Sequence, residues 1–240
     1  KVFPDAYINM GITAENVAEN WDISRVSQEE FALDSHMKSI HARDSGYFKS
    51  EICPISTKDG VINQDGCIRD TSLESMSKLK AVFKDNGSVT AATSSPLTDG
   101  AVCMLVCSSE FAEKNGLEPL ARIVTSAVTG CPPDIMGIGP ISSTQKALER
   151  SGWNIDEVDI FEINEAFSSQ SIAVINELSI DYQKVNIDGG AISLGHPLGA
   201  SGARIVGKAA SILNRTNSER AVATMCIGGG MGITIALERP

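Results

Sequence analysis

The sequence has few of the groups that recognise a polyanion or cross a membrane. Lysine and arginine total 20 residues against 30 aspartate and glutamate residues, for a net charge of −10, and no stretch is basic. Neither a nucleic acid nor an anionic membrane surface is therefore expected as a partner. Apolar runs such as 101–107 end in polar residues and are far shorter than the roughly 18 residues of a membrane span, so we expect no membrane-spanning segment.

Paired cysteines are also lacking. The six cysteines form no CxxC pair and no compact framework; they are Cys53, Cys67, Cys103, Cys107, Cys131 and Cys226. This scatter predicts neither a zinc site nor disulfides, and it indicates a reducing compartment.

Apolar sequence is abundant enough for a folded core. Hydrophobic residues make up 42% of the chain and charged residues 21%, as in a globular protein of one large or two modest domains. Up to residue 98 the chain contains many Gly, Asp, Asn, Ser and Thr residues. It predicts an irregular layer with one helix over 27–45, which Ser27 and Glu30 would cap, and another over 73–83.

From residue 99 onward strand-like and helix-like segments alternate, which predicts a layered α/β domain. The predicted strands cover 101–107, 121–129, 158–162, 221–227 and 233–238. The predicted helices cover 109–115, 142–151, 165–178 and 200–213.

Three stretches place polar groups where a strand ends or a helix begins, which is where α/β sheets gather functional groups. In FEINEAFSSQ, Asn164 follows a strand and is either a helix N-cap or an amide that holds a water or a carbonyl. In GGAISLGHPLGASGARI, His196 lies among five glycines that allow close approach of the backbone to a ligand. His36 and His41 lie on a polar helix and are expected to face solvent.

The third stretch, TMCIGGGMG, contains Cys226. One interpretation is a small buried residue before a hairpin turn, because free cysteine often behaves as a small hydrophobe. The other is a thiol whose pKa is lowered by exposed N–H groups and which serves as a nucleophile or as an acid or base. The residues alone leave both interpretations open.

Together these stretches resemble the thiolase family, in the order in which the family has them. The matching motifs are NEAF at 164–167, GHPLGASGARI at 195–205 and CIGGGMG at 226–232, with MGITAENVAE at 10–19 and GCPPDIMGIGP at 130–140 upstream. The similarity covers nearly the whole chain, and the wording of PPDIMGIGP and DIFEINEAF is most similar to degradative 3-ketoacyl-CoA thiolases.

The resemblance implies a layered α/β fold of two β-α-β-α-β-α-β-β halves, with a loop domain inserted in the first. We expect residues 1–98 to form the loop domain that covers CoA and residues 99–240 to form the C-terminal half, with the N-terminal half absent. In the family that half carries the nucleophilic cysteine, which is acylated as a thioester. The chain alone is therefore expected to be inactive.

The resemblance also implies catalytic roles. Cys226 matches the cysteine that acts as general acid or base on the α-carbon of a CoA thioester. His196 matches the residue that donates a hydrogen bond to the enolate oxygen, and Asn164 matches the residue that holds a water supplying another. The backbone N–H of Gly228 resembles half of a second oxyanion hole.

Four further positions match substrate-binding residues of the family. Arg69 matches an arginine that lies against the CoA adenine, although a solvent-exposed arginine is the simpler interpretation. Ser95 matches a serine that contacts the pantetheine arm. Met136 and Phe167 match residues that shape the acyl and pantetheine pocket, and both residue types also fill cores.

These matches predict an acyltransferase that cleaves 3-ketoacyl-CoA with CoA, through an acyl-cysteine intermediate, to acetyl-CoA and a shortened acyl-CoA. Asn9 favours this direction, because biosynthetic members usually have histidine just before Met-Gly. Two alternatives are an acetyl-CoA C-acetyltransferase that makes acetoacetyl-CoA and a truncated, non-catalytic protein that binds acyl-CoA.

The expected partners are acyl-CoA, CoA and the missing N-terminal half, in a homodimer or tetramer when complete. No cofactor or metal is expected, since CoA thioesters are the substrates. The cytoplasm or the matrix of a mitochondrion or peroxisome is the expected location.

Overall fold

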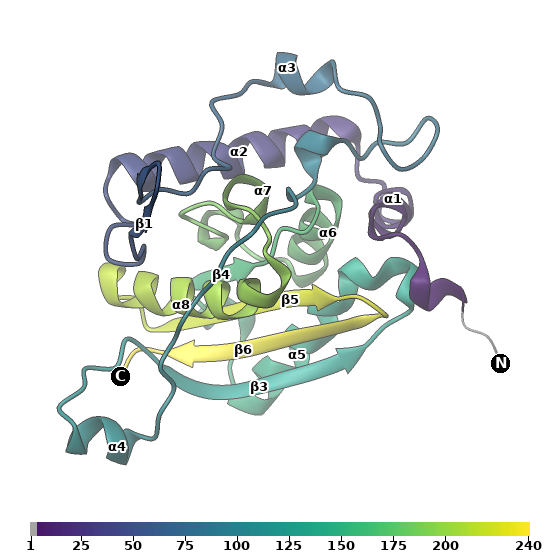
Figure 1. The fold of residues 1–240 in the computed structure, drawn as a ribbon. Coiled ribbons are helices and arrows are strands. Elements are labelled where there is room, and N and C mark those ends of the chain that lie inside the picture. The colour runs from purple at the N-terminus through teal and green to yellow at the C-terminus, as the bar shows by residue number, and fades with distance from the viewer. Residues whose placement is uncertain (1–3) are drawn as a thin grey trace.

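A four-stranded mixed sheet lies at the centre of the chain, which a computed structural model describes for residues 4–240 (Figure 1). The sheet comprises β3 (Arg122–Gly130), β4 (Ile160–Ile163), β5 (Arg220–Ile227) and β6 (Met231–Glu238). The strand order is β3-β6-β5-β4; β4 and β5 are parallel and the other neighbours are antiparallel. The parallel pair matters for function because its two carboxyl ends lie at the same edge of the sheet.

Helices cover both faces of the sheet, because the strand residues on both sides are apolar. Phe161 points to the face where α5 (Gly139–Ser151) and α6 (Ser168–Leu178) supply the core, whereas Ile160 points to the face covered by α8 (Leu198–Thr216). The result is a layered α/β domain.

The predicted elements of this domain are largely present, but one predicted strand is reduced. The observed order is β3-α5-β4-α6-α7-α8-β5-β6, where α7 (Ala191–Leu194) is a single turn. Between α6 and α7 the pattern β-α-β-α-β-α-β-β requires another strand. The structure has there only a parallel bridge between Phe161 and Val185, with the Asn186 N–H donating to the Phe161 carbonyl at 2.8 Å.

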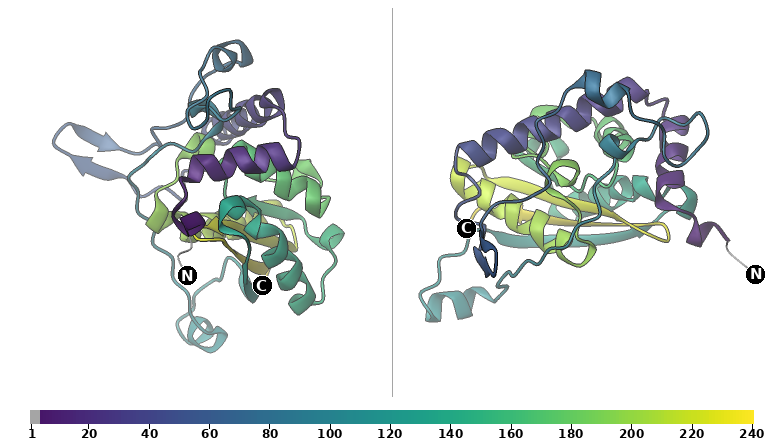
Figure 2. Two further views of the ribbon diagram at one scale, coloured as in Figure 1. Left: turned by 90° about the vertical axis from the view of Figure 1, so that its right-hand side faces the viewer. Right: turned by 45° about the horizontal axis from the view of Figure 1, so that its top comes forward.

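Two helices near the N-terminus cover α6 and α7 (Figure 2). These are α1 (Met10–Asn20) and α2 (Arg25–Asp44), so this region is more regular than the predicted irregular layer. Ser24 caps α2, its hydroxyl accepting from the Ser27 N–H at 3.1 Å, so the predicted cap at Ser27 is wrong by three residues.

The expectation that His36 faces solvent is also wrong. Its side chain is buried, and Nδ1 accepts a hydrogen bond from the Arg69 N–H at 3.2 Å. The next stretch of chain therefore covers this part of α2, which the polar helix sequence did not indicate. His41 is exposed, as predicted.

The shorter elements lie around this framework. They are η1 (Pro4–Tyr7), β1 (Ile55–Thr57), β2 (Gly60–Ile62), α3 (Leu73–Ser77), η2 (Ala91–Thr93), α4 (Ser109–Lys114), η3 (Pro133–Ile138), η4 (Ile155–Glu157) and η5 (Tyr182–Lys184). The helix predicted over 73–83 stops after five residues, and Met76 is its one buried residue. With so little apolar surface to bury, tertiary packing does not extend it.

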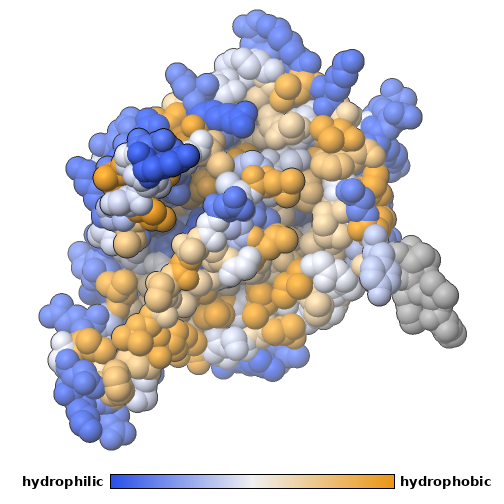
Figure 3. Space-filling model, in the orientation of Figure 1, coloured by the Kyte–Doolittle hydropathy of each residue, from blue (hydrophilic) through white to orange (hydrophobic). Residues whose placement is uncertain are grey.

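The strand predicted over 101–107 is absent. The segment lies without a strand partner in front of α4, and Leu105 and Val106 are 71% and 61% exposed. Its apolar sequence suits a sheet interior, but a strand also needs neighbouring backbone to hydrogen-bond, and none of the described segments supplies it. Figure 3 shows apolar side chains gathered where this segment leads into α4, at the lower left.

The predicted boundary between the two domains, 1–98 and 99–240, stays a prediction. Among residues 4–240, no helix combines the length and apolar character that spanning a membrane requires.

Candidate functional site

The two parallel strands bring Asn164 and Cys226 to one edge of the sheet. Asn164 follows the last residue of β4 and Cys226 is the penultimate residue of β5. The Asn164 N–H donates to the Thr224 carbonyl at 2.9 Å. This bond extends the β4–β5 pairing by one residue and fixes the backbone position of Asn164. Both side chains are buried.

His196 reaches this edge through the loop between α7 and α8. Gly195 before it has φ +99°, and a Cβ there would lie 2.7 Å from the Thr98 hydroxyl oxygen, so glycine is needed for both conformation and space. The Thr98 hydroxyl accepts from the His196 N–H at 2.8 Å. The imidazole Nε2 then lies 3.5 Å from the Asn164 amide nitrogen.

The imidazole is held as a neutral group. Burial lowers the pKa of His196, and the nearby positive charge of Arg204 lowers it further. Its other ring nitrogen, Nδ1, lies 2.6 Å from the Ser201 hydroxyl. A neutral imidazole can donate from only one nitrogen, so His196 acts here as a directed hydrogen-bonding group rather than as a cation.

A packed cluster of apolar side chains, the Cys226 chamber, encloses the thiol of Cys226. Cys226 packs with the buried Met136 and Ala166 and the partly buried Met10 and Phe167. Burial raises the pKa of its thiol to about 12. At neutral pH Cys226 therefore rests with its proton on sulfur, which does not fit a preformed thiolate nucleophile and does fit a group that gives and takes a proton.

Gln170 is the polar side chain that meets this thiol. The Cys226 S–H donates to the Gln170 carbonyl oxygen at 3.8 Å, and the same oxygen accepts from the Ala166 N–H at 3.2 Å. The backbone bond fixes the amide with its oxygen toward the sulfur. An acceptor in that position favours the protonated thiol.

Gly228 lies just beyond Cys226, in the turn that joins β5 to β6. The turn spans three glycines between the paired Ile227 and Met231. Gly228 is exposed, whereas Gly230 is buried, and the Gly230 carbonyl accepts from the Cys131 N–H at 2.8 Å. The backbone of Gly228 is therefore open to a ligand, while Gly230 at the other end of the turn is held in place.

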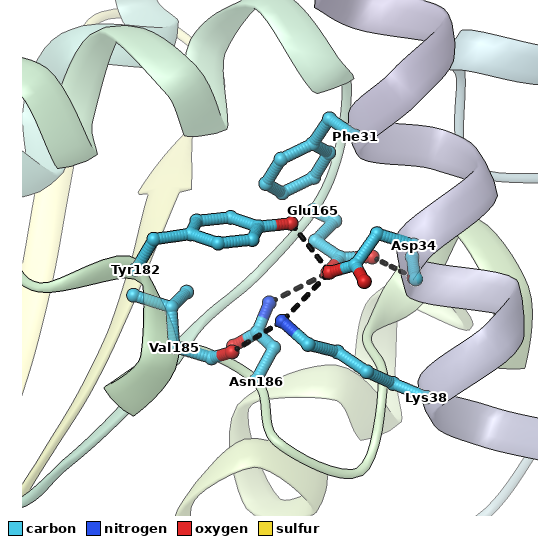
Figure 4. Close-up of a pocket in the computed structure, with 8 residues that line it drawn as sticks. Phe31, Asp34, Lys38, Glu165, Tyr182, Val185 and Asn186 are labelled. Atoms are coloured by element: carbon cyan, nitrogen blue, oxygen red, sulfur yellow. Dashed lines mark hydrogen bonds and ion pairs between the residues drawn. The ribbon is translucent and has the colours of Figure 1, made fainter. Parts of the chain in front are cut away.

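A buried carboxylate supports the loop that carries Asn164. Figure 4 shows Glu165 between α2 and the Tyr182–Asn186 segment. Its oxygens accept from the Ser35 hydroxyl at 2.7 Å, the Asn186 amide at 2.7 Å and the Ile192 N–H at 3.1 Å. Burial raises the pKa of Glu165, and these donors oppose that rise. The carboxyl group is thus committed to holding the loop.

Glu162 is a second buried acid, two residues before Asn164 on β4. Burial raises its pKa to about 8, against the opposing charges of Arg204 and Lys208. Its Oε1 has no hydrogen-bond partner among the described residues, and the same holds for the Nε atom of Arg204. Polar atoms with unused bonding capacity therefore lie behind the site.

Most of the residues predicted to bind substrate lie beside these groups. Ser95 donates its N–H to the Ala166 carbonyl at 3.0 Å, and Met136 and Phe167 line the Cys226 chamber. Arg69 lies apart, with an exposed side chain and its N–H on His36. The substrate-binding roles of these four residues stay predictions.

The structure gives Asn9 a local role. Its side-chain oxygen accepts from the Gly11 N–H at 2.8 Å and caps α1. Asparagine is among the preferred N-cap residues, so its presence there has a sufficient explanation without reference to substrate. Asn9 therefore does not distinguish the degradative from the biosynthetic direction.

Three residues of the site were missed in the sequence. Thr98 holds the His196 backbone, Ser201 contacts its ring, and Gln170 contacts Cys226. Ser201 follows His196 by five residues across a helix start, a spacing that offered a usable signal. Thr98 and Gln170 act across long sequence separations, and no local pattern indicated them.

Comparison with known proteins identifies the family. The model of the thiolase C-terminal domain matches residues 117–239, and the model of the thiolase N-terminal domain matches residues 3–110. Acetyl-CoA acetyltransferase of Chromobacterium violaceum is 44% identical over 98% of this chain and 62% of its own length. The cytosolic acetyl-CoA acetyltransferase of Mus musculus is 45% identical, with the same coverage of both chains.

A solved structure gives the same result. The crystal structure of human mitochondrial 3-ketoacyl-CoA thiolase in complex with CoA has a TM-score of 0.92 and 41% identity, over 97% of this chain and 60% of that one. The chain thus spans about three fifths of the length of the relatives that it matches.

The match to the N-terminal domain corrects one expectation. Residues 3–110 belong to the thiolase N-terminal domain, so the prediction that the N-terminal half is absent is wrong. The error came from treating the loop-rich region as an insertion separate from that domain. Its glycine, serine and asparagine content indicated loops but did not indicate to which domain the loops belong.

Proposed function

Because the chain belongs to the thiolase family, we propose that its site moves a proton at the α-carbon of a CoA thioester during acyl transfer. The observation that carries the proposal is the position, at one sheet edge, of the buried Cys226 thiol and of the His196–Asn164 pair. One group exchanges a proton with carbon. The others meet the oxygen on which charge develops.

The chemistry follows from those positions. In the condensing direction Cys226 first gives its proton to the CoA sulfur that leaves when the acyl-accepting cysteine is acylated. The resulting thiolate then takes a proton from the acetyl carbon, and the electron pair moves onto the thioester oxygen. His196 and a water held by Asn164 donate hydrogen bonds to that oxygen, and each such donor is worth a few kcal/mol in a dry site. In the cleaving direction the Cys226 thiol returns the proton to carbon, and its high pKa keeps that proton available at neutral pH.

We favour acetyl-CoA as the acyl donor and acceptor, as in an acetyl-CoA C-acetyltransferase. The names of the bacterial and mouse relatives support this reading. Thiolysis of longer 3-ketoacyl-CoA is the second candidate, favoured by the similarity to human mitochondrial 3-ketoacyl-CoA thiolase. Gly228, Arg69, Ser95, Met136 and Phe167 keep their proposed roles in the second oxyanion hole and in holding CoA and the acyl group.

A chimera tests the choice between these substrates. The chain would be joined to the part of the Chromobacterium violaceum acetyl-CoA acetyltransferase that lies outside their match. Condensation of acetyl-CoA and thiolysis of 3-ketoacyl-CoA of increasing length would be measured, with the bacterial enzyme as control. Highest activity on acetoacetyl-CoA supports the acetyltransferase, and a rise with chain length supports the second candidate. A folded chimera inactive with all substrates contradicts both.

The 240-residue chain by itself is expected to be inactive in acyl transfer, because none of its six cysteines matches the family's acyl-accepting cysteine. Cys131 is the cysteine to check for acylation, because it lies close enough to Cys226 to affect the pKa of that thiol. Acetylation of Cys131 by acetyl-CoA, found by mass spectrometry and lost in Cys131→Ser, would contradict the expectation.

The ligands, the assembly and the cellular location are also part of the proposal. Free CoA and acyl-CoA are the proposed ligands, and a homodimer or tetramer is the proposed assembly of a thiolase-length protein. A cytosolic relative supports the cytoplasm as a candidate location, with an organelle matrix as the alternative.

A further inference from the structure

Ser201 has two acceptors within reach and a single proton to donate. Its hydroxyl lies 2.6 Å from His196 Nδ1 and 3.1 Å from the Pro197 carbonyl. The choice between them decides the tautomer of the imidazole. A proton given to Nδ1 requires the ring proton to be on Nε2, whereas a proton given to the carbonyl leaves Ser201 accepting from Nδ1–H.

The Pro197 carbonyl does not need this proton. It already accepts from the Ala200 N–H at 2.9 Å and the Ser201 N–H at 3.0 Å, as the first carbonyl of α8. Two donors use both of its lone pairs. Nδ1 is also the shorter contact and has no other partner among the described residues. A hydrogen bond from the Ser201 hydroxyl to Nδ1 is therefore more favourable than one to the Pro197 carbonyl.

We propose that Ser201 is a positioning residue that holds His196 as the Nε2–H tautomer, by donating its hydroxyl proton to Nδ1. The proposal rests on the proposed function only for its consequence: Nε2–H is the form that can donate to the enolate oxygen. The opposite tautomer would present a lone pair there and would repel the developing charge.

The same tautomer explains a buried orphan atom. The Asn164 side-chain oxygen is buried without a hydrogen-bond partner among the described residues, while its nitrogen lies 3.5 Å from His196 Nε2. Exchanging the two ends of the amide places the oxygen opposite Nε2–H, so that in the substrate-free chain the histidine donates to the asparagine until a substrate oxygen replaces it as the acceptor. Ser201, His196 and Asn164 then form one directed chain of hydrogen bonds in the substrate-free chain.

Nitrogen NMR on the 240-residue chain, labelled with ¹⁵N-histidine and free of substrate, tests the proposal. The chain has three histidines, and the long-range ¹H–¹⁵N pattern of each ring distinguishes its two tautomers. His36 is a built-in reference, because its Nδ1 accepts from the Arg69 N–H and so its proton must be on Nε2. At neutral pH we expect His196 to show the same pattern as His36.

Two variants complete the test. Ser201→Ala removes the donor, and we expect a measurable Nδ1–H population at His196 with the His36 pattern unchanged. Ser201→Thr keeps the hydroxyl and should restore the Nε2–H form. An Nδ1–H ring in the wild type, or a purely Nε2–H ring in a folded Ser201→Ala, overturns the proposal; if Ser201→Ala does not fold, the wild-type tautomer alone decides. None of these readouts depends on activity, so failure of the proposed function would be seen separately in the chimera.

Discussion

The two strand ends of the site lie side by side, yet their surroundings are opposite. At the end of β4, Asn164 and His196 belong to a chain of hydrogen bonds that includes Ser201. At the end of β5, Cys226 packs among apolar side chains and donates its S–H to the Gln170 side-chain oxygen. We propose that the difference separates two tasks: the polar groups stabilise charge on an oxygen, and the buried thiol exchanges a proton with carbon.

Loss of the thiol should have the largest effect. In the chimera, Cys226→Ala removes the group that exchanges the proton, and general acid–base catalysis contributes about 10²–10⁴-fold. We therefore expect acyl transfer to fall by about that factor in steady-state assays. Cys53→Ala, at an exposed cysteine, is the matched control and should leave the rate unchanged; a Cys226→Ala rate within a few-fold of wild type would be inconsistent with this role.

Loss of the polar donor comes next. His196→Ala removes a hydrogen bond to the developing oxyanion, a change that typically costs about 10²–10³ in kcat. His41→Ala, at an exposed histidine, is the control. If the effect were confined to KM, His196 would bind the ground state and the transition state equally well. That result would contradict the proposed role of His196 in stabilising the oxyanion.

The buried carboxyl group of Glu162 should make the free energy of unfolding depend on pH. The pKa of Glu162 rises from 4.5 to about 8 in the folded chain, so folding is favoured while the carboxyl is protonated. This contribution is complete below pH 4.5 and is lost as the pH rises through 8, with a total on the order of a few kcal/mol. In Glu162→Gln the free energy of unfolding should change less with pH between 4.5 and 8 than it does in the wild type.

Urea unfolding at several pH values measures this difference. The exposed Glu118→Gln serves as the control and should follow the wild type at every pH. Parallel curves for wild type and Glu162→Gln would show that the Glu162 carboxyl does not titrate abnormally in the folded chain.

The smallest predicted effect is on the apolar side. Met136→Gln keeps a similar volume but brings an amide to the Cys226 chamber, so the pKa of the thiol should fall below its value of about 12. The pH dependence of iodoacetamide alkylation, followed by mass spectrometry of the Cys226 peptide, measures it. The exposed Met37→Gln is the control, and equal pKa values in the two variants would argue against burial as the cause.

The sequence was sufficient to predict most of the strands and helices of the α/β domain. Strand and helix periodicity located β4, β5 and α8, and the catalytic roles of Asn164, His196 and Cys226 stay predictions. These features are local: they depend on apolar spacing and on residues near strand ends.

What the sequence did not predict depends on contacts made over long separations. The strand expected over 101–107 has a suitable pattern but no partner, and a pattern cannot supply one. The burial of His36 requires the chain near Arg69 to lie across α2. Likewise, the high pKa of Cys226 follows from the chamber around it, whereas the adjacent glycines had suggested a lowered one.

The most direct test of the account is exchange of the acetyl protons of acetyl-CoA with deuterated solvent, followed by mass spectrometry. The chimera should incorporate deuterium at the α-carbon well above the rate without enzyme, and Cys226→Ala should reduce incorporation to that background. Exchange by a folded Cys226→Ala chimera at the wild-type rate would contradict the claim that the Cys226 thiol moves the proton.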